Sequence, residues 1–205
     1  MSTHHQSPRN ILFLLLAASF LFVACKKEKS DTGSITIHGK SYATRSIGGK
    51  TWTLSNYEGP GGLHFGNGTV RPEFGRYYSL AEMQALALPA GWRMPTEADY
   101  RQLCESQGVV FSGSRATGQE AIKRLLSQAN WLNIPGSNAS GFNAQPAGYM
   151  FQDAQPIPGD ISEFWTAEGH TISFQEGASG STHNIKFYQN NSGQEYRFNI
   201  RLVRD

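Results

Sequence analysis

The chain has 205 residues, and its 18 Lys and Arg against 16 Asp and Glu give a formal net charge of +2. This length suits one domain with a sizeable core. A nearly neutral balance argues against a nucleic-acid partner, which would require a clustered basic face. The 22 glycines and 12% aromatic residues favour a turn-rich α+β domain over a helical bundle.

The chain begins with the pattern of an export signal. Arg9 precedes an apolar run over residues 11–23, which only Ser19 interrupts. The run is shorter than the roughly 20 residues that span a bilayer. It also lacks the polar side that a helix packed on a protein core would normally have. We therefore predict that residues 1–24 are a secretory signal peptide.

The residues that end this run resemble the lipobox of bacterial lipoproteins. Phe22, Val23 and Ala24 lead directly to Cys25. The resemblance implies that the Cys25 thiol receives diacylglycerol. Several acyl chains on one residue then anchor a domain to a membrane, because each buried methylene contributes about 0.8 kcal/mol. The alternative is a cysteine that merely follows an ordinary cleavage site.

A short polar segment, residues 25–33, follows the predicted cleavage site and predicts a flexible tether. Its lysines followed by Glu28 and Asp31 also resemble the surface-export signals of Bacteroidetes-type lipoproteins. We therefore expect a lipid-anchored protein of the outer membrane. Display on the cell surface and a plain solvated tether both remain open for this segment.

Residues 34–205 read as one domain that opens with a β-meander. Short alternating runs predict strands over 34–38, 42–47 and 50–54, separated by glycine-containing turns. A glycine-rich stretch between Asn56 and Tyr77 predicts a loop without regular structure.

Three helices are predicted after this loop. Ser79 and Glu82 form a capping box for a helix that ends at Leu88, since Pro89 disfavours helical geometry before it. Thr96 is the predicted N-cap of a second helix that runs to Ser106. An apolar stripe predicts a third helix over residues 119–129. Later runs predict strands over residues 161–166, 171–174, 185–188 and 196–203.

Six blocks of residues, in this order along the chain, resemble the Fibrobacter succinogenes major paralogous domain family. They are residues 47–52 with Asn56, 75–78, 88–96 with Tyr100 and Leu103, 141–149, 164–168 and 199–205. The resemblance covers about residues 34–205. It implies a C-type lectin-like α+β fold, similar also to formylglycine-generating-enzyme-like domains, with small antiparallel sheets, two to three helices and long loops. It also implies that the two chain ends pair in one sheet and that the protein is exported, but it assigns no biochemical role.

Several candidate chemistries find little support in the sequence. The stretch 48–51 echoes a phosphate-binding loop, but it precedes a predicted strand and has Thr44 where the motif needs glycine. Cys104 lies among core-facing residues of the second helix and is interpreted as a buried structural cysteine. Formylglycine-generating enzymes use a cysteine pair, so their activity is not expected here. The histidines show no ligand spacing, and we expect neither a metal nor another cofactor.

Four carboxylates fall in the loops and strands of the last third of the chain: Asp153, Asp160, Glu163 and Glu168. They form none of the calcium-binding triplets typical of lectins, and we interpret them as solvated loop carboxylates.

Aromatic residues in the same region predict a binding surface. Tyr149, Phe151 and Trp165 could stack on sugar rings or pack on a protein, and Phe187 and Tyr188 are further candidates. We take the first three, with Glu163 and Glu168, as candidate ligand-binding residues. The alternative that most of these rings face the core remains open.

We therefore expect a membrane-anchored, non-catalytic binding or adhesion module whose partner is a glycan or a surface protein. One rival is a glycan hydrolase that takes its acid and base from Glu163, Glu168 or Asp160. That rival requires two carboxylates in one pocket, roughly 5 to 9.5 Å apart. The other rival is a purely structural component of the envelope.

Overall fold

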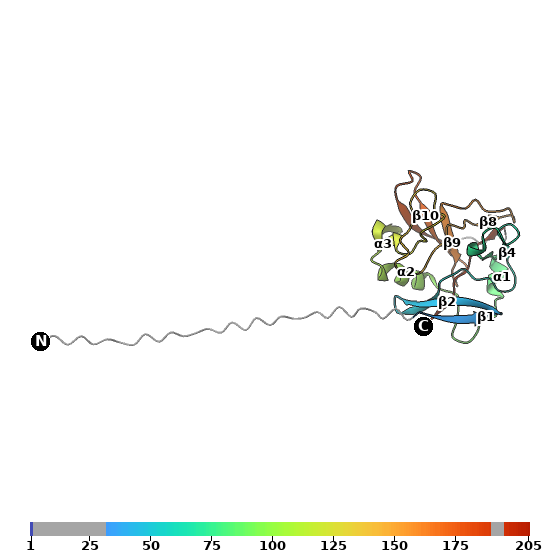
Figure 1. Cartoon of the computed structure of the whole chain (residues 1–205), viewed down its shortest axis with the longest axis horizontal. Coiled ribbons are helices and arrows are strands. Elements are labelled where there is room, and N and C mark those ends of the chain that lie inside the picture. Colours follow the sequence, from blue (N-terminus) through green and yellow to red (C-terminus); the bar gives the residue numbers. More distant parts are fainter. Residues whose placement is uncertain (2–31, 190–194) are drawn as a thin grey trace.

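A four-stranded antiparallel sheet carries both ends of the domain. The computed structural model describes Met1 and residues 32–189 and 195–205, so the predicted signal peptide, Cys25 and most of the predicted tether lie outside the described residues. The strand order is β1 (Thr32–Ile37), β2 (Lys40–Ile47), β3 (Lys50–Thr53) and β13 (Val203–Arg204). The expected pairing of the two chain ends is confirmed, because β13 runs along β3 with Val203 opposite Trp52. The C-terminus accordingly lies beside β1 and β2 (Figure 1).

A second, three-stranded sheet lies on the other side of the domain from β1 (Figure 1). Its order is β11 (His183–Tyr188), β10 (Thr171–Glu176) and β9 (Ile161–Trp165), all antiparallel. Successive side chains of a strand point to opposite faces. One face therefore carries the core residues Phe164, Ile172, Phe174 and Ile185, and the other face carries Glu163 and its neighbours in register.

The predicted helix starts are confirmed, but two of the three ends are wrong. Helix α1 (Leu80–Gln84) has the predicted capping box at Ser79, and α2 (Glu97–Ser106) has one between Thr96 and Asp99. The first helix stops before Leu88, because its last turn closes at Ala85 and the chain then carries Leu86 and Leu88 onto an apolar cluster.

Helix α3 (Gln119–Lys123) also ends earlier than its apolar stripe predicts. The reason lies in its backbone partners. The Leu125 carbonyl accepts from the Ala144 amide, and the Ser127 amide donates to the Ala144 carbonyl. These groups pair with a distant segment, so they are not available to continue the helix. Leu125 and Leu126 are nevertheless fully buried, as the stripe predicts.

Several short elements were not predicted. The glycine-rich loop contains β4 (Leu63–His64), a 3-10 turn η1 (Pro72–Phe74) and β5 (Arg76–Tyr77), and a hairpin of β6 (Val110–Ser112) and β7 (Arg115–Thr117) follows α2. A further ribbon pairs β8 (Met150–Phe151) with β12 (Tyr196–Arg197).

The predicted strand 196–203 is instead two short strands, β12 and β13, joined by a segment through the middle of the domain. Its backbone bonds several different partners in turn. Tyr78 pairs with Phe198, and the carbonyls of Asn199, Ile200 and Leu202 accept hydrogen bonds from the amides of Trp165, Tyr57 and Thr53. A single sheet ladder cannot form when each residue has another partner. The segment therefore joins the two sheets.

Arg201, within this segment, is fully buried. It donates to Asn56 Oδ1 at 2.8 Å and to the carbonyl oxygens of Thr53, Phe142 and Asn143. Burial lowers its pKa to about 9. Carbonyl oxygens thus satisfy this charge, and no ion pair is recorded for it among the described residues.

The interpretation of Cys104 is confirmed. Its thiol is free and fully buried in the largest apolar cluster, and burial raises its pKa. A thiol without access to solvent and with a raised pKa is a poor nucleophile. None of the helices in the described part of the chain is long and apolar enough to cross a membrane.

Candidate functional site

A pocket of about 190 Å³ opens on the outer face of the second sheet, beside the β8–β12 ribbon. Strand alternation brings Ile161 and Glu163 of β9, Gln175 of β10 and Tyr188 of β11 to this face. The complete lining is Tyr149, Ile161, Glu163, Gln175, Tyr188, Tyr196 and Phe198. Segments up to 49 positions apart in the sequence therefore meet in one concave site.

Aromatic rings form most of the wall of this pocket. Tyr196 stacks on Phe198 with ring centroids 5.8 Å apart, and Tyr149 packs against both rings, also at 5.8 Å. Tyr149 and Tyr188 are each 37% exposed, so parts of their rings are open to a ligand. Gln175 Nε2 donates to Tyr188 Oη at 3.0 Å and orients that ring.

Gly148 determines how the chain enters the pocket. Its φ of 68° lies in the left-handed region, and a Cβ there would stand 2.8 Å from the Ile157 carbonyl oxygen. Only glycine allows both the conformation and the close approach. The Gly148 amide also donates to the Ile161 carbonyl at 2.7 Å, which places Tyr149 beside β9.

Among the residues that the structure describes, Glu163 is the only carboxylate that lines this pocket. Glu163 is 5% exposed, and one of its carboxylate oxygens accepts a hydrogen bond from Thr171 Oγ1 at 2.6 Å. No ion pair to Glu163 is recorded among the described residues. Burial raises the pKa of this carboxyl to about 7, against a smaller opposing effect of the Thr171 hydrogen bond. Both the charged and the neutral form of this side chain are therefore populated near neutral pH.

A second hollow of about 340 Å³ adjoins the pocket and shares Tyr149 and Ile161 with it. Its wall is largely apolar, with Phe151 and Ile157 exposed, and Asp160 lies at its edge. The pKa of Tyr149 is raised by burial first and then by the charges of Glu163 and Asp160, among others. Both carboxylates therefore act on the same phenol from the two hollows.

The structure brings three of the predicted ligand-binding residues together. Tyr149 belongs to both hollows, Phe151 to the second and Glu163 to the first. Ile161, Gln175, Tyr196 and Phe198 were not predicted. The alternation of β9 and β10 is a signal that could have found Ile161 and Gln175. No pattern in the sequence around Tyr196 predicts its place in the pocket, because it meets Tyr149 only through tertiary contacts.

Trp165 is a wrong prediction, because its ring is fully buried. The indole donates to the Tyr78 carbonyl at 2.7 Å and meets Phe198 edge-on, with centroids 4.8 Å apart. The segment that contains Phe198 covers this part of the sheet, so a ligand cannot reach the ring. Phe187 is partly buried against the core, and the Arg101 guanidinium lies 4.4 Å from its centroid.

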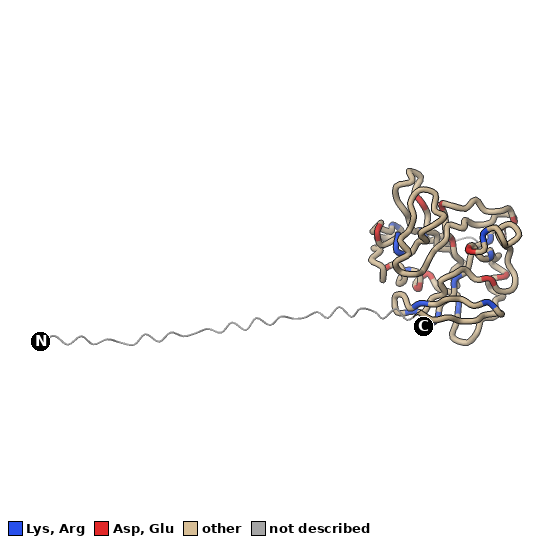
Figure 2. The backbone as a smooth tube through the Cα atoms, viewed as in Figure 1, with Lys and Arg blue, Asp and Glu red and all other residues tan. Residues whose placement is uncertain are grey.

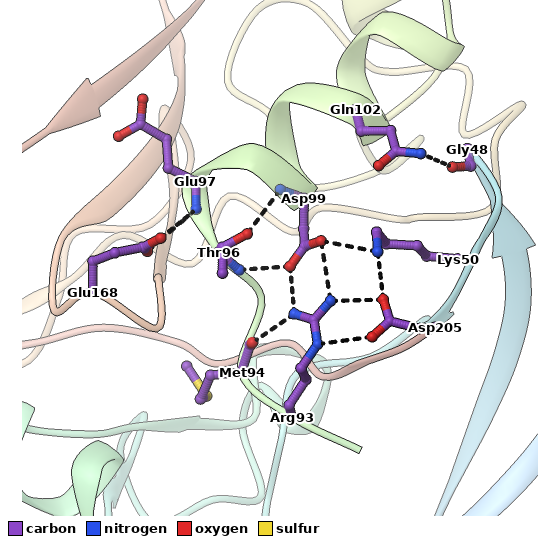
Figure 3. Close-up of polar contacts among 10 residues, drawn as sticks. All are labelled: Gly48, Lys50, Arg93, Met94, Thr96, Glu97, Asp99, Gln102, Glu168 and Asp205. Atoms are coloured by element: carbon purple, nitrogen blue, oxygen red, sulfur yellow. Dashed lines mark hydrogen bonds and ion pairs between the residues drawn. The ribbon is translucent and has the colours of Figure 1, made fainter. Parts of the chain in front are cut away.

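Glu168 lies apart from Glu163 and lines neither hollow. Its carboxylate accepts from the backbone amide of Glu97, the first residue of α2, at 3.3 and 3.2 Å (Figure 3). An anion at this position satisfies a free amide and the positive end of the helix. This carboxylate is therefore used to hold the helix start.

A second polar region, the ion-pair cluster, consists of Lys50, Arg93, Asp99 and Asp205 (Figure 3). Arg93 binds Asp99 through Nη1 and Nη2, at 2.5 and 3.2 Å, and Asp205 through Nη2 at 2.8 Å. Lys50 Nζ pairs with Asp205 and lies 3.3 Å from Asp99 Oδ1. The cluster thereby joins β3, the start of α2 and the last residue of the chain.

Each charge in the cluster has a partner of opposite sign. Burial alone would raise the pKa of Asp99, but hydrogen bonds from Arg93 and Thr96 outweigh it and hold that pKa well below its usual range. Hydrogen bonds from Arg93 and Lys50 lower the pKa of Asp205 to about 2. Lys50, from the stretch that echoes a phosphate loop, is thus engaged by carboxylates of the chain itself.

The described residues contain no group of three or more His, Cys, Asp or Glu that could hold a metal ion. Lys and Arg are interspersed with Asp and Glu over the domain (Figure 2). The charged positions along the backbone therefore do not separate into one basic and one acidic region in this view.

Comparison with protein families gives one result. The family model of the Fibrobacter succinogenes major domain matches residues 55–204, which include the aromatic pocket, α2 and, from the ion-pair cluster, Arg93 and Asp99. Comparisons with curated proteins and with solved structures return no match.

Proposed function

The chain belongs to the Fibrobacter succinogenes major domain family, and from this premise we propose that it is a non-catalytic ligand-binding or adhesion module. Its ligand is a glycan or a protein. The observation that carries the proposal is the tyrosine-lined pocket around Glu163, with a larger apolar hollow beside it. Partly exposed aromatic rings with a few convergent polar groups are typical of ligand sites.

The proposed place of action is the outer membrane, through lipid on Cys25. Residues 1–24 and the residues around the cysteine support this from the sequence. The chain enters the folded domain at β1, whereas β10 lies toward the opposite end in Figure 1, with β9 between them. This arrangement suits a tethered domain that presents its pocket away from the membrane.

We further propose that the fold is C-type lectin-like. The pairing of both chain ends in one sheet and the long connections above it support this assignment. The small antiparallel sheets and three short helices agree with it.

A glycan array probed with the full chain, purified in detergent, tests the binding proposal. We expect binding to a defined set of sugars, and a loss of affinity of about tenfold in Tyr188→Ala, because a stacked ring contributes roughly 1.4 kcal/mol. Val110→Ala is the control, since Val110 is 61% exposed on β6 and lines neither hollow. If no sugar binds, the glycan form of the proposal is refuted.

Fractionation of cells tests the anchor. We expect Cys25→Ser to leave the membrane fraction for the soluble one. The matched control is Cys104→Ala, which removes the only other cysteine and should stay in the membrane fraction. Retention of Cys25→Ser in the membrane would contradict lipid attachment at this residue.

One observation favours a second candidate, a glycan hydrolase. Glu163 has the raised pKa of a general acid and faces a pocket, and Asp160 lies at the edge of the adjoining hollow. Glu168, the other residue considered, is engaged at α2. Hydrolysis of an oligosaccharide that is lost in both Glu163→Gln and Asp160→Asn would establish this candidate over the non-catalytic one.

A further inference from the structure

The Glu163 carboxyl has no cationic partner in the described part of the chain. Its recorded hydrogen bond comes from Thr171, and residues 190–194 contain no Lys or Arg. Asp160, which lines the adjoining hollow, is also an acidic residue and offers no positive charge. A buried carboxylate without a cationic partner is costly to the fold. Such a group at the wall of an open pocket is suited to a ligand that carries the missing charge.

Lys186 is the one cation of the second sheet that faces the same way. Glu163 and Lys186 lie opposite Ser173 from its two sides, so all three side chains share a face. Lys186 is exposed, and no ion pair joins it to Glu163. One strand separates the two residues, and Lys186 does not line the pocket. Lys186 therefore does not neutralise Glu163, and a cationic group of a ligand can occupy the position next to the carboxyl.

The aromatic wall suits a cation as well. Tyr149, Tyr188 and Tyr196 surround the same space as Glu163, and Tyr149 packs on Tyr196. The face of a tyrosine ring attracts an ammonium group through its quadrupole. Three tyrosines and one carboxylate therefore converge on a site for an organic ammonium ion.

We propose that this pocket binds the free ammonium group of an unacetylated amino sugar, with Glu163 as its counter-ion and the tyrosine rings around it. The inference rests on the proposed binding function and names its ligand class. A sugar ring offers an apolar face to Tyr149 and hydroxyls to Gln175 and the tyrosine hydroxyls. The adjoining hollow, with Phe151 and Ile157, has room for the next sugar unit.

The test compares glucosamine oligomers with N-acetylglucosamine oligomers of the same length, by calorimetry on the full chain in detergent. The two ligands differ in the charge and acetyl group at one nitrogen. We expect the glucosamine oligomer to bind about tenfold tighter or more. Glu163→Gln should bring the ratio of the two affinities close to one, whereas Lys186→Met should leave it unchanged.

A pH series gives a second, independent readout. An oligomer with trimethylated amines keeps its positive charge at every pH, so only the protein titrates. Its affinity should fall about tenfold from pH 8 to pH 6 as Glu163 takes up a proton, and Glu163→Gln should show no such fall. If Glu163→Gln does not fold, Tyr188→Ala serves in its place and should weaken the glucosamine oligomer about tenfold.

The outcomes separate this inference from the function on which it rests. Equal affinity for the acetylated and free oligomers overturns the ammonium site and leaves the binding function standing. Absence of binding to these oligomers and to every other sugar overturns both the ammonium site and the glycan form of the function. Binding of a lysine peptide without binding of either oligomer overturns the amino-sugar ligand and moves the cation to a protein partner.

Discussion

The ion-pair cluster and the aromatic pocket place carboxylates in opposite situations. In the cluster, the Asp99 carboxylate has two cations and the Thr96 backbone amide as partners, and its pKa is lowered. In the pocket, Glu163 has a single hydroxyl partner among the described residues, and its pKa is raised to about 7. A carboxylate with all its partners supplied by the chain stabilises the fold. One left short of partners at an open pocket costs stability and is available to a ligand.

Removal of Asp99 should have the largest effect on stability. Asp99→Ala leaves Arg93 and Lys50 with one carboxylate fewer and removes half of the α2 capping box. We expect a loss of about 3 kcal/mol in the free energy of unfolding, measured by denaturant titration. Glu105→Ala, on the exposed side of the same helix, should change it by less than about 0.5 kcal/mol. Similar losses in the two variants would show that the cluster is not a stabilising element.

Glu163→Gln should raise the free energy of unfolding, whereas Asp99→Ala lowers it. A carboxyl with a folded pKa of about 7 and an ordinary value of 4.5 binds its proton more tightly in the folded state. The fold therefore loses stability as the pH rises from about 4.5 to about 7, and the loss is complete above 7. We expect Glu163→Gln to match the parent in free energy of unfolding near pH 4 and to exceed it by about 3 kcal/mol at pH 8.

Thermal unfolding of the two proteins across this pH range measures the difference. A parent that is more stable than Glu163→Gln at pH 8 would mean that the carboxylate has partners of its own and that the contrast with Asp99 does not hold.

Gly148→Ala should damage the pocket at a smaller cost to the fold. The substitution combines left-handed backbone geometry with a Cβ 2.8 Å from the Ile157 carbonyl, and we expect a loss of about 1 to 2 kcal/mol. Gly39→Ala is the matched control, since its φ is 78° but nothing lies within 4 Å of the added Cβ. Ligand binding should weaken only in Gly148→Ala. Equal binding in both variants would show that Gly148 does not position Tyr149 in the pocket.

Glu168→Gln should have the smallest effect. The carboxylate caps the exposed start of α2, which is worth about 0.5 kcal/mol. Glycan binding, measured on the same array, should be unchanged because Glu168 lines neither hollow. Loss of binding in Glu168→Gln with an unchanged melting temperature would return this residue to the ligand site.

The sequence by itself determined the features that depend on residues close to one another along the chain. The β-meander, the starts of α1 and α2, the buried Cys104 and the family all follow from local patterns, and each is confirmed. Capping boxes and alternation act over a few residues, so they can be seen without a fold.

Only the tertiary structure decided the ends of α1 and α3, the burial of Trp165 and the composition of the pocket. Leu125 pairs its carbonyl with Ala144, Trp165 is covered by Phe198, and Tyr196 reaches Tyr149 from a strand near the end of the chain. Sequence patterns indicate which residues are apolar enough to be buried. Which segment covers a given residue depends on packing between parts of the chain that are far apart in the sequence. For the same reason, Glu163 and Glu168 look alike in the sequence, and their different partners in space separate a ligand site from a helix cap.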